Sequence, residues 1–313
     1  MHLLTLATAN ASLRIAPHIG GSMASFDIAG VPILRPAADA TLAARDVRGV
    51  ACYPLVPYSN RIRDARLHFA GRTFALARNF GEHPNSIHGV GWQREWTVLE
   101  ASRAHARLAL THDANARAWP WPFEATQAFH LAPDPSRGER PSAILTVTLT
   151  IANTGHEPFP FGLGFHPFFA RGADTRLRFH AERVWENDAT QLPRSRVALP
   201  PAWRFERGRT LDDIALDNVF VGWDRTATIG DASRERSVRI DADRSLGFVV
   251  VYAPSGADFV AFEPVTHETD AFNRNAAGAS GTGMRILAPS AAFSCTMRVA
   301  AAVAAKAHPR TSS

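Results

Sequence analysis

The sequence contains very few thiols and almost no lysine. Its 313 residues include two cysteines, Cys52 and Cys295, and the only lysine is Lys306. Two thiols are too few for the disulfide framework of a small secreted domain, and they fit a reducing cytoplasm. The formal charge of +5 therefore rests on arginines, which are scattered among acidic residues. Because a nucleic-acid-binding surface needs clustered basic residues with interleaved aromatics, we expect no nucleic-acid partner.

Long apolar runs are also missing. No run of about 18 apolar residues is present, so we expect no membrane-spanning helix and no membrane partner. The first ten residues lack the basic segment of a secretory signal, so we expect a cytoplasmic location. There is no Gly-x-Ser-x-Gly elbow, no Gly-x4-Gly-Lys-Ser/Thr loop and no complete dinucleotide fingerprint. These absences argue against serine hydrolases and nucleotide-binding enzymes.

Short stretches with strand character recur along the chain, with turn signals between them. Residues 143–151 alternate threonine with large aliphatic residues, which is the period of a half-buried antiparallel strand. Residues 246–252 form an apolar run typical of a strand buried on both faces. Residues 67–76 predict a hairpin that turns at Ala70-Gly71. Further strands are expected at 12–15, 25–28, 31–34, 96–99, 106–110, 124–131, 177–179, 237–240, 259–262 and 293–299.

The rest of the chain contains little helix and no linker. Short helices are expected within 39–47 and 300–307, and exposed loops at 132–141, 191–203 and 275–283. Because no linker interrupts the strands, we predict an all-β fold, a large antiparallel β-sandwich formed by one domain at residues 1–303. Residues 304–313 are expected to form a disordered tail.

Polar residues suited to ligand binding are concentrated in residues 53–92. Asn60 and Arg61 supply a carboxamide and a guanidinium, both of which bind oxygen-rich ligands. The hairpin at 67–76 would fold the chain back and bring His88 close to them. From spacing alone, a surface arginine at Arg61 and a hydrogen-bonded turn histidine at His88 are the favoured explanation, because such motif matches are often false positives.

Two further candidates lie in the middle of the chain. His166 stands among phenylalanines after a glycine-rich bend, where burial can shift its pKa. Either a ligand contact or a hydrogen bond to a backbone carbonyl would explain it. Asp217 precedes an asparagine and aromatic residues, and its carboxylate suits a pair of sugar hydroxyls or an Asx turn.

Glu263 is the sharpest candidate because it continues the apolar strand at 259–262. A carboxylate in such a strand is unfavourable unless it is paired or functional. Desolvation raises the pKa of such a group toward neutral pH, which suits a general base. Glu268 and Asp270 follow in a more polar stretch and are expected to be solvated or to structure a loop.

Together these motifs resemble the aldose 1-epimerase (galactose mutarotase) family over essentially residues 1–300. The motifs are, in order, Asn60-Arg61-Ile62, Ile87-His88-Gly89, Phe165-His166-Pro167, Asp217 and Glu263. The resemblance implies a galactose mutarotase-like β-sandwich that acts on a small-molecule sugar without a metal or other cofactor, as a monomer or homodimer. It also implies that His88 and Arg61 hold the sugar near its ring oxygen and anomeric hydroxyl, while Asn60 and Asp217 bind hydroxyls.

The implied activity is the interconversion of the α and β anomers of a free aldohexose such as galactose or glucose. By resemblance, Glu263 is the general base for the anomeric hydroxyl and His166 is the general acid for the ring oxygen. The ring opens, C1 turns about the C1–C2 bond, and the ring closes on the opposite face. We expect the carboxylate and the imidazole to flank the sugar from opposite sides.

Other functions remain open on the sequence. The family includes hexose-6-phosphate epimerases, for which Arg63 and Arg66 are candidate phosphate ligands. A non-catalytic sugar-binding protein would use the same fold. A metal-dependent sugar enzyme would need His88, His166 and Glu263 to converge as ligands.

One departure from the family concerns a sugar-contacting glutamine. Longer galactose mutarotases carry this residue in an inserted stretch that is missing before Glu263 in this chain. Asp258 is the candidate to replace its hydroxyl contact. The physiological sugar therefore stays undetermined by the sequence.

Overall fold

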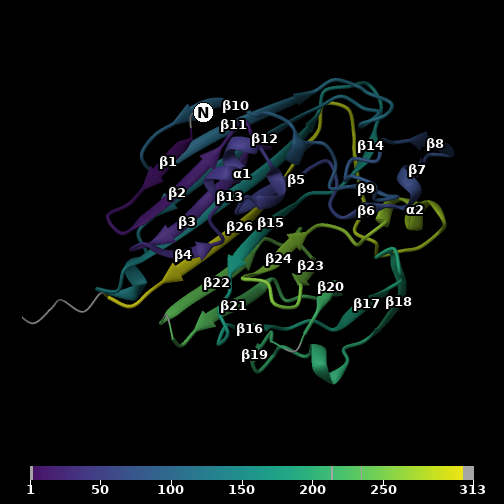
Figure 1. Cartoon of the computed structure of the whole chain (residues 1–313). Helices are drawn as coiled ribbons and strands as arrows, with labels where there is room; N and C mark the ends of the chain where they lie inside the picture. The colour runs from purple at the N-terminus through teal and green to yellow at the C-terminus, as the bar shows by residue number, and fades with distance from the viewer. Residues whose placement is uncertain (1–2, 213, 234, 306–313) are drawn as a thin grey trace, which may run out of the picture.

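Strands dominate the computed structural model, which describes residues 3–212, 214–233 and 235–305. Two large antiparallel sheets pack face to face and enclose the main hydrophobic core (Figure 1). This arrangement confirms the predicted all-β sandwich. Most of the expected tail, residues 306–313, lies outside the described residues. Among the residues described, no helix is both long and apolar enough to cross a membrane.

The first sheet has eleven strands within the described chain, and it carries the candidate site. One of them, β5 Cys52–Leu55, lies beside the main path and pairs with both β15 and β3. In spatial order the others are β1 Leu4–Ala7, β2 Ala11–Ala16, β3 Ser22–Ile28, β4 Val31–Leu34, β15 Gly164–Ala170, β24 Phe259–Val265, β23 Phe248–Ala253, β20 Leu216–Val221, β17 Arg183–Asn187 and β18 Pro193–Ala198.

The second sheet has nine strands in the same described ranges. Its order is β10 Thr97–Ala101, β11 His105–His112, β12 Phe123–Ala132, β13 Ser142–Asn153, β26 Ala292–Ala302, β22 Arg236–Ala242, β21 Thr226–Asp231, β16 Arg176–Phe179 and β19 Arg209–Thr210. In β13 the side chains of Leu145, Val147, Leu149 and Ile151 are fully buried between the sheets, while Thr148 on the outer face bonds to Thr296 of β26 at 2.9 Å. The alternation in the sequence thus predicted this strand and its two faces correctly.

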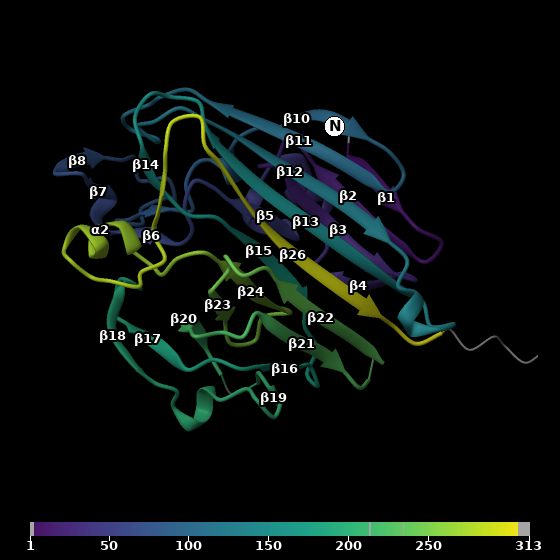
Figure 2. The ribbon, with the colours of Figure 1, turned by 180° about the vertical axis from the view of Figure 1, so that it is seen from behind.

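Short elements cluster at one end of the sandwich, on the right in Figure 1 and on the left in the reverse view of Figure 2. They include the expected hairpin, whose strands are β7 and β8. The paired strands are β6 Arg61–Ile62 with β9 Ser86–Ile87, β7 Arg66–Phe69 with β8 Arg72–Ala75, and β14 Phe159–Phe161 with β25 Arg285–Leu287. Helix α2 Ala271–Ala276 lies at this end, whereas α1 Asp39–Ala44 does not (Figure 1). Along the described chain, 3-10 turns occur at Val47–Gly49, Arg63–Ala65, Gly91–Gln93, Pro135–Arg137 and Pro201–Trp203.

Two segment predictions are wrong. The stretch 191–203, expected to be a loop, contains the edge strand β18, whose side chains alternate between exposed and half-buried. Residues 300–302, expected to be helical, end strand β26 because they pair with β13 on one side and β22 on the other. Pairing with two neighbouring strands therefore overrides the helix propensity of these alanines.

Candidate active site

The candidate site lies on the outer face of the first sheet, away from the second sheet. Side chains alternate between the two faces of a strand. In β15, Phe165 and Phe169 therefore point into the main core, whereas His166 and Phe168 point outward. A separate apolar cluster that includes Tyr53 and Phe168 covers this outer face.

Strand register brings the two proposed catalytic residues together. Strand β15 pairs with β24 so that Gly164 lies opposite Val265 and Phe168 opposite Ala261. Midway between these pairs, His166 lies opposite Glu263. The imidazole Nε2 is 3.1 Å from the carboxyl Oε1, and both side chains are almost completely buried. The expectation that the two groups flank a sugar from opposite sides is wrong, because no ring fits between groups in hydrogen-bond contact.

Burial is the main influence on the pKa of both groups. It raises the pKa of Glu263 well above its ordinary value, and the charge of Asp217 adds to this rise against the effect of Arg61. Burial lowers the pKa of His166 to about 3. Because burial disfavours the charged form of each group, we expect the pair to share one proton between Oε1 and Nε2 near neutral pH.

His88 is a neutral hydrogen-bond donor. Its Nδ1 accepts the backbone N–H of Asn60 at 3.0 Å, and its own backbone N–H donates to the Asn60 carbonyl at 2.8 Å. Because Nδ1 acts as an acceptor, the proton of the neutral ring is on Nε2. Burial, together with the nearby His166 and Arg61, lowers the pKa of His88 well below its ordinary value. The reciprocal bonds hold both residues at positive φ, 57° for Asn60 and 60° for His88.

Asn60, Arg61 and Asp217 form a chain of hydrogen bonds beside this pair. Arg61 donates from Nη1 to the Asn60 Oδ1 and from Nη2 to the Asp217 Oδ2, each at 3.0 Å. Arg61 is therefore an organised cavity residue and not one of the scattered surface arginines. Asp217 lies within strand β20, which excludes the Asx-turn alternative for this residue.

These six residues line one cavity of about 300 Å3. The volume lies at the lower end of the range for small-molecule sites, as expected for a compact ligand. The lining also includes Arg35, Tyr53, Phe168 and Tyr252, to which the sequence assigned no site role. Of these, only Phe168 carried a usable signal, because it lies two residues after His166 and so on the same strand face.

A buried histidine next to Asn60, His267, was not predicted from the sequence to support the site. The His267 Nε2 accepts the backbone N–H of Ser59 at 3.0 Å, and its Nδ1 donates to the carbonyl of Glu268 at 2.7 Å. It thereby supports the turn that carries Asn60. A Cβ at Gly162 would lie 1.8 Å from the His267 ring, which explains the glycine-rich bend before His166.

Several residues expected near the sugar lie elsewhere. Arg63 is half-exposed and pairs with Asp270 at 3.6 Å, while Arg66 is exposed, and neither lines the cavity. Asp258 is exposed and also lies outside it. The expectation of a solvated Glu268 and Asp270 is wrong, since both are buried. Glu268 accepts a hydrogen bond from the Trp185 indole and pairs with Arg274, while Asp270 accepts the backbone N–H of Arg63.

A metal-dependent sugar enzyme would need His88, His166 and Glu263 to converge as metal ligands, and the described residues do not show this arrangement. Within the described ranges, no three His, Cys, Asp or Glu side chains are grouped as metal ligands. The Nδ1 of His88 is occupied by a backbone N–H, and His166 faces Glu263 through Nε2. The donor geometry therefore favours hydrogen bonding over coordination.

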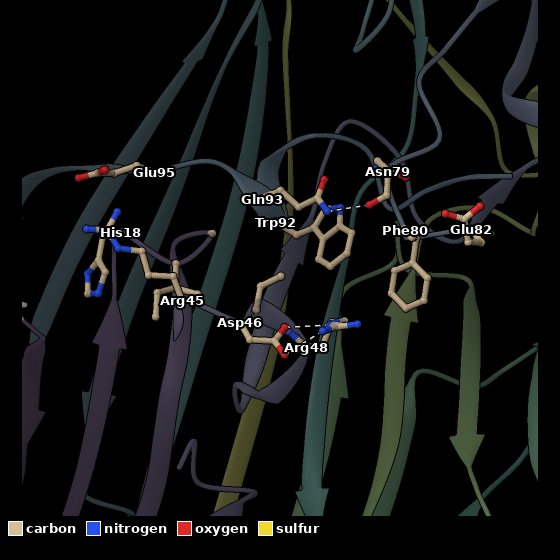
Figure 3. Close-up of a pocket in the computed structure, with 14 residues that line it drawn as sticks. His18, Arg45, Asp46, Arg48, Asn79, Phe80, Glu82, Trp92, Gln93 and Glu95 are labelled. Atoms are coloured by element: carbon tan, nitrogen blue, oxygen red, sulfur yellow. Dashed lines mark hydrogen bonds and ion pairs between the residues drawn. The ribbon is translucent and has the colours of Figure 1, made fainter. Parts of the chain in front are cut away.

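A second cavity of about 700 Å3 adjoins the first, and Phe80 and Arg48 line both. Figure 3 shows its wall, where Arg48 pairs with Asp46 at 2.9 Å and Gln93 donates to the carbonyl of Asn79 at 2.8 Å. The guanidinium of Arg48 is thus neutralised by a neighbouring carboxylate.

Comparisons with known proteins agree with this architecture. The family model for aldose 1-epimerase matches residues 2–300. The chain is 28% identical over 286 residues to the uncharacterised Escherichia coli K12 protein YphB, covering 89% of this chain and 92% of YphB. An Escherichia coli K12 crystal structure, provisionally named an aldose 1-epimerase, superposes with a TM-score of 0.85 at 26% identity and covers 96% of this chain and 99% of that one. Galactose 1-epimerase from Lactobacillus acidophilus NCFM shares the fold, with a TM-score of 0.74 at 17% identity, and coverage is 96% of this chain and 94% of that one. The chain belongs to the aldose 1-epimerase family and has its galactose mutarotase-like β-sandwich.

Proposed function

We propose that the protein is an aldose 1-epimerase that interconverts the α and β anomers of an aldohexose such as galactose or glucose. The observation that carries this proposal is the 3.1 Å contact between Glu263 and His166 at the floor of a small polar cavity. A buried carboxyl and imidazole that share one proton form a general acid–base pair whose pKa values burial has moved far from their ordinary positions.

The adjacent placement of the two groups suits the reaction. The anomeric hydroxyl oxygen and the ring oxygen are both bonded to C1, so neighbouring groups can reach both. In the form of the pair that has the shared proton on the His166 Nε2, the Glu263 carboxylate takes the proton of the anomeric hydroxyl while His166 protonates the ring oxygen. The C1–O5 bond breaks and an aldehyde forms at C1. After rotation about C1–C2 the same transfers run in reverse, so that protons are conserved within the pair and the sugar.

The other cavity residues hold the sugar. His88 offers its Nε2–H to an oxygen at C1, and a neutral imidazole does so without competing for the proton that Glu263 receives. Arg61 keeps the carboxamide of Asn60 and the carboxylate of Asp217 in fixed positions, where they can bind ring hydroxyls. Such preorganised polar groups define the orientation of a polyol.

The decisive test is the rate at which the anomers of freshly dissolved α-galactose and α-glucose exchange, measured by NMR or polarimetry. We expect the wild-type protein to accelerate exchange and Glu263→Gln to lose about 100-fold or more of that acceleration. The amide preserves the size of the side chain, so circular dichroism should show an unchanged fold. The matched control is Glu124→Gln, an exposed position on β12. Full activity in Glu263→Gln would reject Glu263 as the base.

The other candidate functions predict different results. A non-catalytic sugar-binding protein would bind the sugar in NMR titrations without any exchange. The hexose-6-phosphate alternative cannot rely on Arg63 and Arg66, which do not line the cavity. A different arginine, Arg35, does line it, and this observation keeps an acidic sugar among the candidates.

A further inference from the structure

We infer that Arg35 selects aldoses that carry an anionic group at C6, such as a phosphate or a carboxylate. The inference rests on the proposed function, because it uses the position of His166 relative to the ring oxygen of the sugar. Nothing in the local sequence around Arg35 indicates this role.

Arg35 is held rigidly against the cavity wall. Its Nη2 donates to the backbone carbonyls of Arg48 and Val50, both at 2.9 Å. Its guanidinium carbon lies 4.2 Å from the ring centroid of Phe168 and 4.6 Å from that of Phe259. Backbone carbonyls and two aromatic rings fix the plane of the guanidinium before any ligand arrives.

Arg35 differs from the two other arginines of the cavity in its charge balance. Arg61 is neutralised by Asp217 and Arg48 by Asp46, each through an ion pair. Over the ranges that the structure describes, Arg35 forms no ion pair with a carboxylate, and its buried Nε has no hydrogen-bond partner. The positive charge of Arg35 is therefore available to a ligand.

Acidic groups act on Arg35 only from longer range within the described chain. Asp258, Tyr53 and Tyr252 influence the guanidinium electrostatically, and burial, which lowers its pKa, has a larger effect than any of them. A guanidinium still keeps its charge at neutral pH. A partly buried guanidinium without a counter-ion favours an anionic ligand, because the anion supplies the missing charge-assisted hydrogen bonds.

The position of Arg35 matches C6 of a bound sugar. The ring of Phe168 stacks on His166 with centroids 4.5 Å apart, and Arg35 lies over that phenylalanine. The ring oxygen protonated by His166 is bonded to C5, which carries C6. Glu263 lies opposite His166 on the neighbouring strand β24, and Phe168 lies two residues further along β15. Phe168 lines the cavity and Gly164 does not, so the cavity extends along β15 toward Phe168. With C1 at Glu263, the C6 substituent therefore points toward Arg35.

The test compares glucose, glucose 6-phosphate and glucuronate with wild-type protein and three variants. NMR titration gives the Kd of each sugar, and anomer exchange gives kcat/KM. We expect at least one acidic sugar to bind about tenfold or more tightly than glucose, the effect of one charge-assisted hydrogen bond. In Arg35→Met the ratio of Kd values should fall toward one, and Arg35→Lys should keep part of the preference. The matched control is Arg107→Met, an exposed arginine on β11 of the other sheet, which should keep the full ratio.

Each result of this comparison either supports or overturns the role of Arg35 in binding an anionic sugar. Preference for the phosphate alone, the carboxylate alone or both identifies the anion, provided that the preference depends on Arg35. Equal Kd values for all three sugars in the wild-type protein, or an undiminished preference in both Arg35 variants, would overturn it. The Kd ratio is measured independently of turnover. Selective binding without exchange would therefore contradict the proposed reaction while leaving the role of Arg35 intact.

Discussion

His88 and His166 line the cavity and His267 supports the turn that carries Asn60; burial lowers the pKa of each, yet their nitrogen atoms have different partners. Both ring nitrogens of His267 are bonded to the backbone, which makes it part of the scaffold. His88 accepts a backbone N–H and keeps one donor for a ligand. His166 alone among the three faces a carboxyl group, at 3.1 Å from Glu263. We therefore propose that His166 transfers the proton, while His88 acts as a neutral donor and His267 as a structural support.

The shared proton leads to a prediction about pH. Below its lowered pKa of about 3, His166 takes up a second proton and the pair has no acceptor. Above the raised pKa of Glu263 the pair loses the shared proton and has no donor. We therefore expect kcat/KM for anomer exchange to show no acidic limb near 6.5, the ordinary pKa of histidine.

The measurement is a pH profile of enzyme-catalysed exchange from about pH 4 to 9, with the uncatalysed rate subtracted at each pH. Circular dichroism at each pH identifies any loss caused by unfolding. A fall of about tenfold in kcat/KM around pH 6.5 with the fold intact would show that His166 titrates as an ordinary exposed histidine. The single-proton account of the pair would then be wrong.

At the scale of elements, the turn after β9 decides where His88 stands. His88 and Gly89 both have positive φ, and Gly89 packs against the chain that follows β5. A Cβ on Gly89 would lie 2.4 Å from the carbonyl oxygen of Val56. That carbonyl also accepts the backbone N–H groups of Val90 and Gly91, so it cannot move freely. Glycine is required here both for its conformation and for the close approach.

We accordingly expect Gly89→Ala to lower stability by about 2 kcal/mol or more and to lower kcat/KM by displacing His88. Gly71→Ala is the matched control. Gly71 has a similar φ of 73° in the β7–β8 turn, and nothing lies within 4 Å of its added Cβ. It should cost only about 1 kcal/mol and leave exchange unchanged. Urea denaturation and anomer exchange measure the two effects. Equal losses in both variants would mean that the close contact at Gly89 is unimportant.

The elements that sequence reasoning predicted well are those with local signals. Strand β13 shows alternation, and the β7–β8 hairpin carries an Ala-Gly turn. Strand β18 was missed because an edge strand with one neighbour is polar and contains proline, and its pattern resembles a loop. The end of β26 was missed because alanine favours helices when no neighbouring strands are considered. In each failure the deciding factor was a partner strand distant in the sequence.

At the scale of the whole molecule, the geometry of the site also depends on strand pairings between segments distant in the sequence, which the sequence alone did not predict. Resemblance supplied Glu263, His166 and the proposed sugar-binding residues, and the structure brings them into one cavity. It did not supply their mutual geometry, because the contact between His166 and Glu263 depends on the register of β15 with β24. Arg35 and Tyr252 belong to segments with no motif, and only the order of strands in the first sheet brings them to the cavity.

The sheet that carries the site is tied to the second sheet by a buried ion pair. Arg236 of β22 pairs with Asp231 of β21, and both side chains are fully buried. The same guanidinium donates to the carbonyls of Pro32 in β4 and Ala170 in β15, both in the first sheet. Thr175 donates to Asp231 as well. One arginine therefore connects the two layers close to the end of the strand that carries His166.

Removal of this arginine should have a large effect on the stability of the fold. Arg236→Met leaves Asp231 buried without its cation, so we expect a loss of about 3–5 kcal/mol in the free energy of unfolding. Arg239→Met on the same strand is the matched control, because Arg239 is half-exposed and pairs with Asp241 at the surface. It should lose less than about 1 kcal/mol. Urea denaturation followed by tryptophan fluorescence gives both values.

A second variant separates the ion pair from the contacts between the sheets. Arg236→Met combined with Asp231→Leu removes both charges, which relieves the unpaired carboxylate but leaves the carbonyls of Pro32 and Ala170 without their donor. We expect this double variant to recover only part of the loss, because the hydrogen bonds from the second sheet to β4 and β15 of the first sheet are still missing. Complete recovery would show that the stabilisation comes from charge pairing alone, and that Arg236 does not hold the two layers together through its backbone contacts. Equal losses of unfolding free energy in Arg236→Met and Arg239→Met would contradict the prediction that Arg236 stabilises the fold more than Arg239. Burial of the guanidinium would then not affect how much an arginine on this strand contributes to stability.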